Sequence, residues 1–130
     1  QHLVQNFLNS NSELNTLPFV RKFIKKYINH YKMGIASSGS RKNIEIALKR
    51  LNLYNYFDPI LCSEDVIKSK PSPEIFLKIC SLGNFKKKEC LIFEDSKNGI
   101  KASKLAGIQY IDVTKYPFNV LLEKFKISHE

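Results

Sequence analysis

The amino-acid sequence predicts an α/β protein in which a parallel sheet is flanked by helices. Short apolar runs, of which residues 91–93 are the clearest, alternate with segments whose apolar residues recur at helical spacing. The connections between these runs are too long for hairpins and suit right-handed βαβ crossovers. Polar clusters follow several of the runs, at the strand ends where open parallel sheets bind their ligands.

The composition fits one globular domain and limits its partners. The chain has 130 residues and a net charge of +9, nearly all from lysine, which favours anionic partners. We expect no nucleic-acid role, because no zinc-finger, helix-turn-helix or RNA-binding motif accompanies the charge, although a basic nucleic-acid binder remains the third alternative. We also expect no membrane partner, since no apolar run approaches about 18 residues and the N-terminus does not resemble a signal peptide.

Three cysteines, Cys62, Cys80 and Cys90, are widely spaced in apolar surroundings. Their odd number and spacing favour small buried side chains over disulfides or zinc ligands. This pattern indicates a reducing compartment, the cytoplasm. The three histidines stand apart in the sequence, which argues against a catalytic or metal-binding histidine.

The N-terminal part of the chain predicts helices. Residues 1–15 carry a few apolar side chains on a possible short helix and then a polar stretch, NSNSELN. Thr16 can cap a longer helix, whose apolar residues recur as far as Tyr31 while basic residues take the other face. The apolar face of this helix should pack on the sheet.

A serine-rich turn, Ser37 to Ser40, follows a predicted strand at 33–36, and Arg41 begins the next helix. Backbone N–H groups in such a turn, together with the positive end of the helix dipole, can bind phosphate. An N-cap with a flexible approach explains the same residues equally well. The turn alone therefore leaves both interpretations open.

A restrained lysine precedes the third predicted helix. A short strand is expected at 60–62, and further on Ser72 can cap a helix with Pro73 in its first turn. The neighbouring prolines restrict the backbone at Lys70, so its ammonium could be held toward a site. A solvated loop lysine is the alternative.

The most informative stretch is LIFEDSKNGI, residues 91–100. It indicates a strand, an acidic turn formed by Glu94 and Asp95, and a helix beginning near Ser96. Two carboxylates at the end of a parallel strand suit a hard cation such as Mg2+. A charged turn that complements the helix dipole is the alternative, and for this stretch taken alone it is the stronger one.

The rest of the chain completes the predicted sheet. The helix after the acidic turn should end at Gly107, a fourth strand is expected at 110–113, and a short outer helix at 117–127. The serine turn, Lys70 and the acid pair would then meet at one edge of the sheet. Together they supply the phosphate donors, positive charge and metal ligands that phosphoryl transfer requires.

Three segments, IASSGSRKN, SKPSPEIF and IFEDSKNGIKASKLAGI, resemble in order and spacing the second, third and fourth motifs of the haloacid dehalogenase (HAD) superfamily. The closest resemblance, over about residues 18–113, is to the branch of β-phosphoglucomutase and related sugar-phosphate and nucleotide phosphatases. It implies a HAD-like Rossmannoid core at 16–130. It also implies a Mg2+-dependent phosphatase of small phosphorylated metabolites that acts through an aspartyl-phosphate. A phosphomutase of the same family and a non-enzymatic phosphate-binding α/β module are the alternatives.

The resemblance also implies roles for individual residues. Ser37 resembles the residue whose hydroxyl binds a phosphoryl oxygen, and Ser38 the neighbour whose backbone N–H helps. Lys70 resembles the lysine that balances the charge of the phosphoryl group and the nucleophile. Glu94 and Asp95 resemble the Mg2+-binding acids, with Asp95 favoured for direct coordination. The phosphate-binding set implied is Ser37, Ser38, Gly39 and Lys70, and the catalytic residues implied are Lys70 and Asp95.

The first motif of the family, an Asp-x-Asp that supplies the nucleophile, has no counterpart here. None of the four aspartates lies in such a motif; they are Asp58, Asp65, Asp95 and Asp112. Most of the family's helical cap is also absent, and residues 1–15 resemble its trailing end. The resemblance therefore implies the C-terminal part of a HAD-type phosphatase, inactive alone. Without the first strand, which the family places at the sheet centre, we expect its two neighbours to pair directly or another chain to fill the gap.

Overall fold

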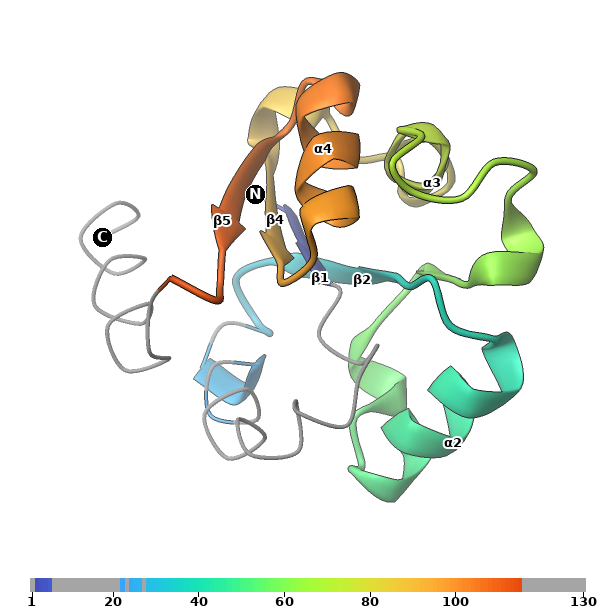
Figure 1. Ribbon diagram of the computed structural model, residues 1–130. Helices are drawn as coiled ribbons and strands as arrows, with labels where there is room; N and C mark the ends of the chain where they lie inside the picture. The colour runs from blue at the N-terminus through green and yellow to red at the C-terminus, as the bar shows by residue number, and fades with distance from the viewer. Residues whose placement is uncertain (1, 6–21, 23, 27, 116–130) are drawn as a thin grey trace.

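The computed structural model describes residues 2–5, 22, 24–26 and 28–115, with the backbone alone for residues 2–5. Its centre is a five-stranded parallel sheet in the order β3-β2-β1-β4-β5 (Figure 1). The strands are β1 (His2–Gln5), β2 (Lys32–Ala36), β3 (Ile60–Leu61), β4 (Cys90–Glu94) and β5 (Gln109–Asp112). The helices are α2 (Arg41–Arg50), α3 (Glu74–Gly83) and α4 (Lys97–Ala106), with short 3-10 turns η2 (Tyr54–Tyr56), η3 (Ser63–Asp65) and η4 (Lys87–Glu89). The predicted α/β class, a parallel sheet flanked by helices, is confirmed.

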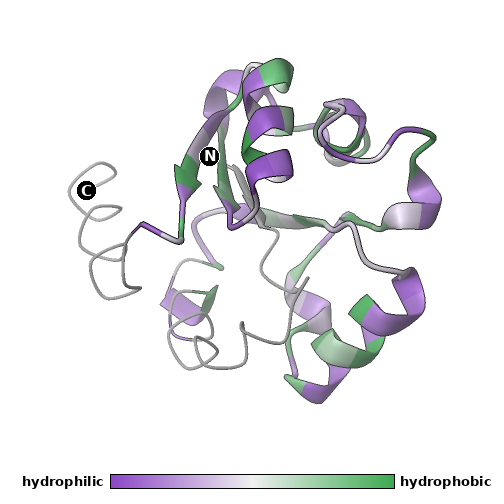
Figure 2. Ribbon diagram, in the orientation of Figure 1, coloured by the Kyte–Doolittle hydropathy of each residue, from purple (hydrophilic) through white to green (hydrophobic). Residues whose placement is uncertain are grey.

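The sheet separates two hydrophobic clusters, and alternate residues of a strand point into one or the other. In β4, Leu91 and Phe93 belong to the cluster beneath α2, whereas Cys90 and Ile92 belong to the cluster beneath α3 and α4. Figure 2 shows α2 and α4 with hydrophobic residues along one side and hydrophilic residues along the other. Burial on both faces explains why the strands read as apolar runs rather than as alternating sequences.

The ends of the helices follow the sequence signals, with one difference. Ser40 and Ser96 cap α2 and α4 by accepting a backbone N–H of the first turn, and α4 ends before Gly107, whose φ of 75° favours glycine. The difference is at α3, where Pro73 is itself the N-cap residue. The Ser72 hydroxyl still accepts the N–H of Glu74, at 3.2 Å, from outside the helix.

The centre of the sheet corrects one prediction. The strand expected to be missing is formed by the chain's own residues, because β1 pairs in parallel with both β2 and β4. The expectation that β2 and β4 close together, or that another chain lies between them, is therefore wrong. The extended segment at residues 2–5 pairs with backbone groups that both neighbours would otherwise bury without partners. Association with a second chain stays a prediction, without a gap in the sheet to support it.

Several predicted elements lie wholly or partly outside the described residues. The helix expected from residue 16 is seen only in part, where Ile24 is fully buried in the hydrophobic cluster that includes Ile44 and Leu48 of α2. Residues 2–5 form a core strand rather than a short helix, whereas residues 6–15 and the helix expected at 117–127 are not described. The domain boundary after residue 15 therefore stays a prediction. Within the described part, no helix is both long and apolar enough to cross a membrane.

Candidate active site

The carboxyl ends of β2 and β4 are joined by the side chain of Lys70. Its Nζ donates to the carbonyl oxygen of Ala36, at 2.9 Å, and to Oε2 of Glu94, at 3.1 Å. Lys70 is 7% exposed and Glu94 is 0% exposed. The restrained lysine of the sequence is thus a buried partner of the acidic turn, and the alternative of a solvated loop lysine is excluded.

Burial shapes the electrostatics of this lysine. Its Nζ also lies 5.0 Å from the centre of the Phe76 ring, on the first turns of α3. Loss of solvation lowers the pKa of Lys70, and the nearby charge and hydrogen bond of Glu94 oppose that shift. A positive charge is therefore held at the strand ends in a place where water screens it little.

The second oxygen of Glu94 organises the acidic turn. Glu94 Oε1 accepts the backbone N–H of Asp95, at 3.0 Å, and the N–H and hydroxyl of Ser96, both at 3.1 Å. The side chain fits because Gly99 follows in α4, where an added Cβ would lie 1.9 Å from the Glu94 carboxyl carbon. Both oxygens of Glu94 are thus used within the protein, so Asp95 is the acid of this pair better suited to a cation.

Asp95 lies at the end of β4 with its Oδ1 shielded from solvent. A hard carboxylate oxygen at this edge fits Mg2+, which usually takes one or two protein carboxylates and completes its shell with water and substrate phosphate. Within the described residues, no group of three or more His, Cys, Asp or Glu side chains is placed to hold a metal ion. The acidic turn could therefore supply part of a magnesium site.

The serine turn is held against the end of β3. Ser37 is 1% exposed, and its backbone N–H donates to the carbonyl of Leu61 at 2.9 Å. Its hydroxyl oxygen accepts the N–H of Gly39 at 3.0 Å, and Ser38 is exposed beside it. The turn therefore lies at the same edge as Lys70, as the sequence predicted, while its binding of phosphate stays a prediction.

The N-terminus of α2 differs from the sequence-based interpretation in one way. Its first N–H, at Arg41, donates to both carboxylate oxygens of Glu64, at 2.9 and 3.2 Å, and the N–H of Asn43 donates to the Ser40 hydroxyl at 3.3 Å. The protein's own side chains therefore occupy part of the helix end that was expected to face a phosphate. The hydroxyl and backbone of the turn, rather than the first turn of α2, are left to meet an anion.

The acids of η3, Glu64 and Asp65, make contacts that the sequence did not predict. The guanidinium of Arg41 donates to Asp65 and, at 2.9 Å, to the carbonyl of Ile60, while Ser63 N–H donates to the Gly39 carbonyl at 3.0 Å. These contacts clamp the serine turn to the segment that leads to Lys70. The signal that could have revealed them is the pair of acids in a tight turn directly after a predicted strand.

The remaining aspartates lie away from Lys70. Asp65 accepts a hydrogen bond from Arg41, Asp58 is separated from β3 by Pro59, and Asp112 ends β5, where its Oδ1 accepts the N–H of Thr114 at 3.0 Å. All four aspartates of the chain belong to its described part. Among the described residues, the carboxylates beside Lys70 are therefore those of Glu94 and Asp95, and both are parts of the acidic turn.

One hollow bordered by described residues lies away from this edge. It has a volume of about 400 Å³ and lies at the opposite ends of the strands, bordered by residues such as Lys32, Asp58 and Gly83. None of the predicted site residues lines it. The candidate site is therefore identified by its polar and charged side chains and not by a cavity.

The profile of the haloacid dehalogenase-like hydrolase family matches residues 2–113. The chain belongs to this family. It is 38% identical over 80 residues to the phosphorylated carbohydrates phosphatase of Thermotoga maritima, a match covering 62% of this chain and 37% of that protein. The resemblance inferred from the three motifs is thereby confirmed.

Solved structures agree with the assignment to the HAD-like family. A Thermotoga maritima protein provisionally named a β-phosphoglucomutase is 32% identical, with a TM-score of 0.62 over 76% of this chain and 44% of that one. The protein YfnB of Bacillus subtilis, solved with bound magnesium, is 26% identical, with a TM-score of 0.64 over 69% of this chain and 41% of that one. This HAD-like chain therefore spans less than half the length of each of these proteins.

Proposed function

We propose that this HAD-like chain is part of a Mg2+-dependent phosphatase of small phosphorylated metabolites, such as sugar phosphates or nucleotides. The observation that carries the proposal is the buried Lys70–Glu94 pair, at the edge where the serine turn and Asp95 also lie. A phosphoryl group in transfer is stabilised mainly by positioned donors and positive charge, and this edge supplies both. The phosphorylated carbohydrates phosphatase similar to this chain supports the same substrate class.

Each residue has a distinct part in the proposal. Ser37 donates its hydroxyl and Ser38 its backbone N–H to phosphoryl oxygens, and Gly39, whose own N–H donates to the Ser37 hydroxyl oxygen, completes the phosphate-binding turn. Lys70 balances negative charge on the phosphoryl group and the nucleophile. Asp95 holds Mg2+, which when bound neutralises charge on the phosphoryl oxygens. Glu94 orients both Lys70 and the turn that carries Asp95, and it is the second candidate for the metal.

The covalent step needs an aspartate that the described site does not provide. An aspartyl-phosphate forms on a carboxylate beside the lysine, and the carboxylates of Glu94 and Asp95 already serve the lysine, the turn and the metal. We therefore propose that the nucleophile lies outside these 130 residues, and that this chain alone binds phosphate without turning it over. The three free cysteines support a reducing compartment, and on that ground we propose the cytoplasm.

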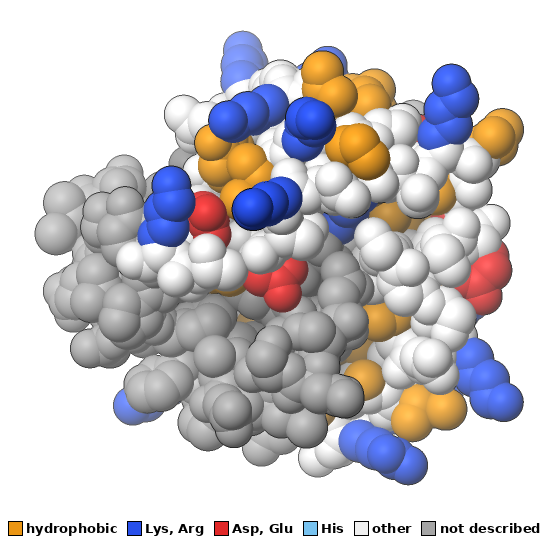
Figure 3. Space-filling view, viewed as in Figure 1, with side chains coloured by type: hydrophobic (Ala, Val, Ile, Leu, Met, Phe, Trp, Pro, Cys, Tyr) orange, Lys and Arg blue, Asp and Glu red, His pale blue; other side chains and the backbone are white. Residues whose placement is uncertain are grey.

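Two alternatives of the same site have specific support. A phosphomutase is favoured by the provisional name of the Thermotoga maritima structure. A non-enzymatic phosphate-binding module is favoured because none of the four aspartates is placed to act as the nucleophile: Asp95 is the proposed metal ligand, and the other three are not beside Lys70. Nucleic-acid binding has less support, because Figure 3 shows Lys and Arg in separate places on this face rather than in one dense patch. Phosphate monoester hydrolysis accounts for the polar groups at the site most completely.

Phosphate binding and turnover test the proposal separately. Titration calorimetry with inorganic phosphate and Mg2+ should show binding to this chain, weakened at least about tenfold in Lys70→Met because a buried positive charge is removed. Lys101→Met, at an exposed lysine of α4, is the matched control. Colorimetric assays on sugar phosphates and nucleotides should show no turnover by this chain.

The same assays on the chain extended by its upstream coding sequence should show turnover. Asp95→Asn should then lower the rate at least about 100-fold, as expected when a group that stabilises transition-state charge is lost. Turnover by the 130-residue chain, abolished by Asp95→Asn, would contradict the proposal that the nucleophile lies elsewhere. Phosphate binding without turnover in the extended protein would favour the binding module.

A further inference from the structure

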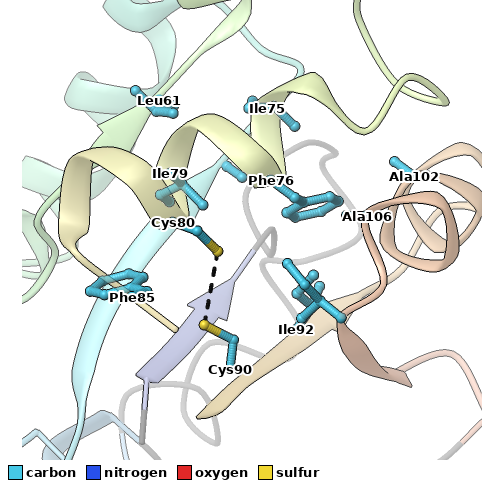
Figure 4. Close-up of a cluster of buried hydrophobic side chains, with 12 residues drawn as sticks. Leu61, Ile75, Phe76, Ile79, Cys80, Phe85, Cys90, Ile92, Ala102 and Ala106 are labelled. Atoms are coloured by element: carbon cyan, nitrogen blue, oxygen red, sulfur yellow. Dashed lines mark hydrogen bonds between the residues drawn. The ribbon is translucent and has the colours of Figure 1, made fainter. Parts of the chain in front are cut away.

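Two thiols near the amino ends of the strands, opposite to the ends that carry the serine turn, face each other in a way that phosphate chemistry does not use. The Sγ atoms of Cys80 and Cys90 are 3.9 Å apart (Figure 4). We propose that these two cysteines form a dithiol site, which two-electron oxidants of the hydroperoxide class convert to an intramolecular disulfide. This proposal does not depend on the proposed phosphatase activity.

The backbone fixes both thiols in place. Cys80 lies in the last turn of α3 and is 6% exposed, and Cys90 is the first residue of β4 and is 2% exposed. The carbonyl of Cys80 accepts the N–H of Phe85 at 2.8 Å, and Cys90 Sγ donates to the Lys86 carbonyl at 3.2 Å. A disulfide joins its sulfurs at about 2 Å, so the thiols need to approach by about 2 Å more.

The segment between the two cysteines can accommodate this approach. It consists of residues 81–89, most of them exposed apart from the buried Phe85, and includes the left-handed Asn84 and the turn η4. Leu82 and Gly83, just after Cys80, line the hollow at this end of the sheet, so small oxidants can come near the end of α3. The thiol pair therefore lies beneath a connecting segment and not at the centre of the core.

The environments of the two thiols assign their roles. The hydrogen bond with Cys90 lowers the pKa of Cys80 despite burial, and the charge of Lys87 contributes to the lowering. The same hydrogen bond and burial raise the pKa of Cys90. Because the thiolate is the nucleophile, Cys80 is the thiol that attacks and Cys90 the thiol that resolves.

The reaction balances with a hydroperoxide as the oxidant. The Cys80 thiolate attacks the terminal peroxide oxygen; an S–O bond forms, the O–O bond breaks, and the alcohol, or water from hydrogen peroxide, leaves after taking a proton. The Cys90 sulfur, losing its proton, then attacks the resulting sulfenic acid; the S–S bond forms and water leaves. Two thiols are oxidised by two electrons, and one peroxide is reduced.

Cys62 provides a matched control within the same chain. It is 0% exposed and belongs to the other hydrophobic cluster, beneath α2. Burial raises the pKa of its thiol to about 11. Burial therefore makes the Cys62 thiol slow to react with a hydroperoxide. Any selective oxidation of Cys80 and Cys90 then has to come from their pairing.

Oxidation of the 130-residue chain by hydrogen peroxide tests the proposal. The wild type and Cys62→Ser should both lose about 2 Da in intact mass, and a non-reducing peptide map should show a Cys80–Cys90 link. The wild type should keep one titratable thiol. Cys80→Ser and Cys90→Ser should lose no mass in this way. Cys90→Ser should instead gain oxygen on Cys80, whereas Cys80→Ser lacks the attacking thiol and should react slowly.

Three outcomes would overturn the proposal. They are three intact thiols in the wild type after peroxide has fully oxidised the urea-unfolded chain, a link that includes Cys62, or disulfides between chains. Should a serine variant fail to fold, the wild-type peptide map still decides between these outcomes, with Cys80→Ala and Cys90→Ala as replacements. The oxidised chain should also show a thermal midpoint several degrees higher, because closing a short loop restricts the unfolded chain.

Discussion

Lys70 and Glu94 form a buried ion pair on which the site depends. Side-chain exposures of 3% and 0% leave neither charge in contact with bulk water. Loss of one partner leaves the other charge buried alone, which costs more than the pair itself contributes. We therefore expect Lys70→Met to lower the free energy of unfolding by about 3–5 kcal/mol, as measured by urea denaturation.

A double variant separates the cost of losing the ion pair from the cost of leaving one charge buried without its partner. In Lys70→Met with Glu94→Gln, the amide oxygen can still accept the N–H groups of Asp95 and Ser96, and no buried charge remains. This double variant should be at least about 1 kcal/mol more stable than Lys70→Met alone. Equal stability of the two would show that Glu94 does not bear an uncompensated charge in the single variant.

Gly99 is required by the position of the Glu94 side chain. Alanine normally stabilises a helix interior by about 1 kcal/mol over glycine, but a Cβ here would lie 1.9 Å from the Glu94 carboxyl carbon and 2.1 Å from its Oε2. We expect Gly99→Ala to lower the free energy of unfolding by about 3 kcal/mol, measured in urea, because Glu94 must leave its hydrogen bonds.

Two variants control this prediction. Asn98→Ala, at the exposed neighbouring position of α4, should change stability by less than about 0.5 kcal/mol. Glu94→Ala together with Gly99→Ala should cost clearly less than the sum of the single variants, since the clash is gone. Additive costs would mean that the glycine acts through the helix backbone and not through Glu94.

At the scale of single residues, the sequence could predict which residues belong to the site better than the directions in which their side chains point. The prolines beside Lys70 and the apolar strand before Glu94 indicated that both belong to one edge of the sheet. The direction of each carboxylate could not be predicted, because Glu94 turns inward only where Gly99 leaves space and Lys70 offers a partner. The contact with Lys70 joins residues that are 24 positions apart along the chain.

Among the elements, η3 connects the serine turn to the lysine. Asp65 loses solvation on folding, but hydrogen bonds from the Cys62 N–H and from Arg41 outweigh that loss and lower the pKa of the carboxyl below its ordinary 3.8. A lowered pKa in the folded state stabilises the protein above the unfolded value, and the stabilisation is lost as the pH falls through the folded value.

Asp65→Asn therefore predicts a change in pH dependence. At neutral pH the variant should be less stable than the wild type by about 1 kcal/mol, and the difference should shrink below pH 3.8 as the wild-type carboxyl is protonated. Urea midpoints at several pH values measure this. Asp58→Asn, at an exposed aspartate, controls for the loss of one charge. A difference that stays constant down to acid pH would exclude an ionised Asp65 as the source.

Most of the elements could be predicted, and the errors have local causes. Short apolar runs and capping serines located β2, β4, α2 and α4 to within a residue or two. The start of α3 was misplaced by one residue because Ser72 and Pro73 both suit a helix N-terminus. In the structure Pro73 is the N-cap residue, so the helix begins at Glu74. The clamp by η3 was missed because its hydrogen bonds connect segments more than 20 residues apart.

For the whole molecule, the sheet depends on its central strand. β1 pairs with β2 on one side and with β4 on the other, so it joins the two halves of the sheet. The sequence could not predict this role, since residues 2–5 are too few to show a period and nothing nearby marks them as a core strand. Residues 2–5 are held in the sheet because the buried strands β2 and β4 both need hydrogen-bond partners for their backbone groups.

Proline in β1 tests this dependence through the backbone alone. Val4 lies inside the strand, in register with Gly34 of β2 and Ile92 of β4. Val4→Pro removes an N–H from the centre of the sheet and should lower the free energy of unfolding by about 3 kcal/mol or more. His2→Pro, at the first residue of the same strand, should cost much less, because proline is tolerated there. Circular dichroism with urea denaturation compares the two. Equal stability of both variants would mean that β2 and β4 hold the sheet together without β1.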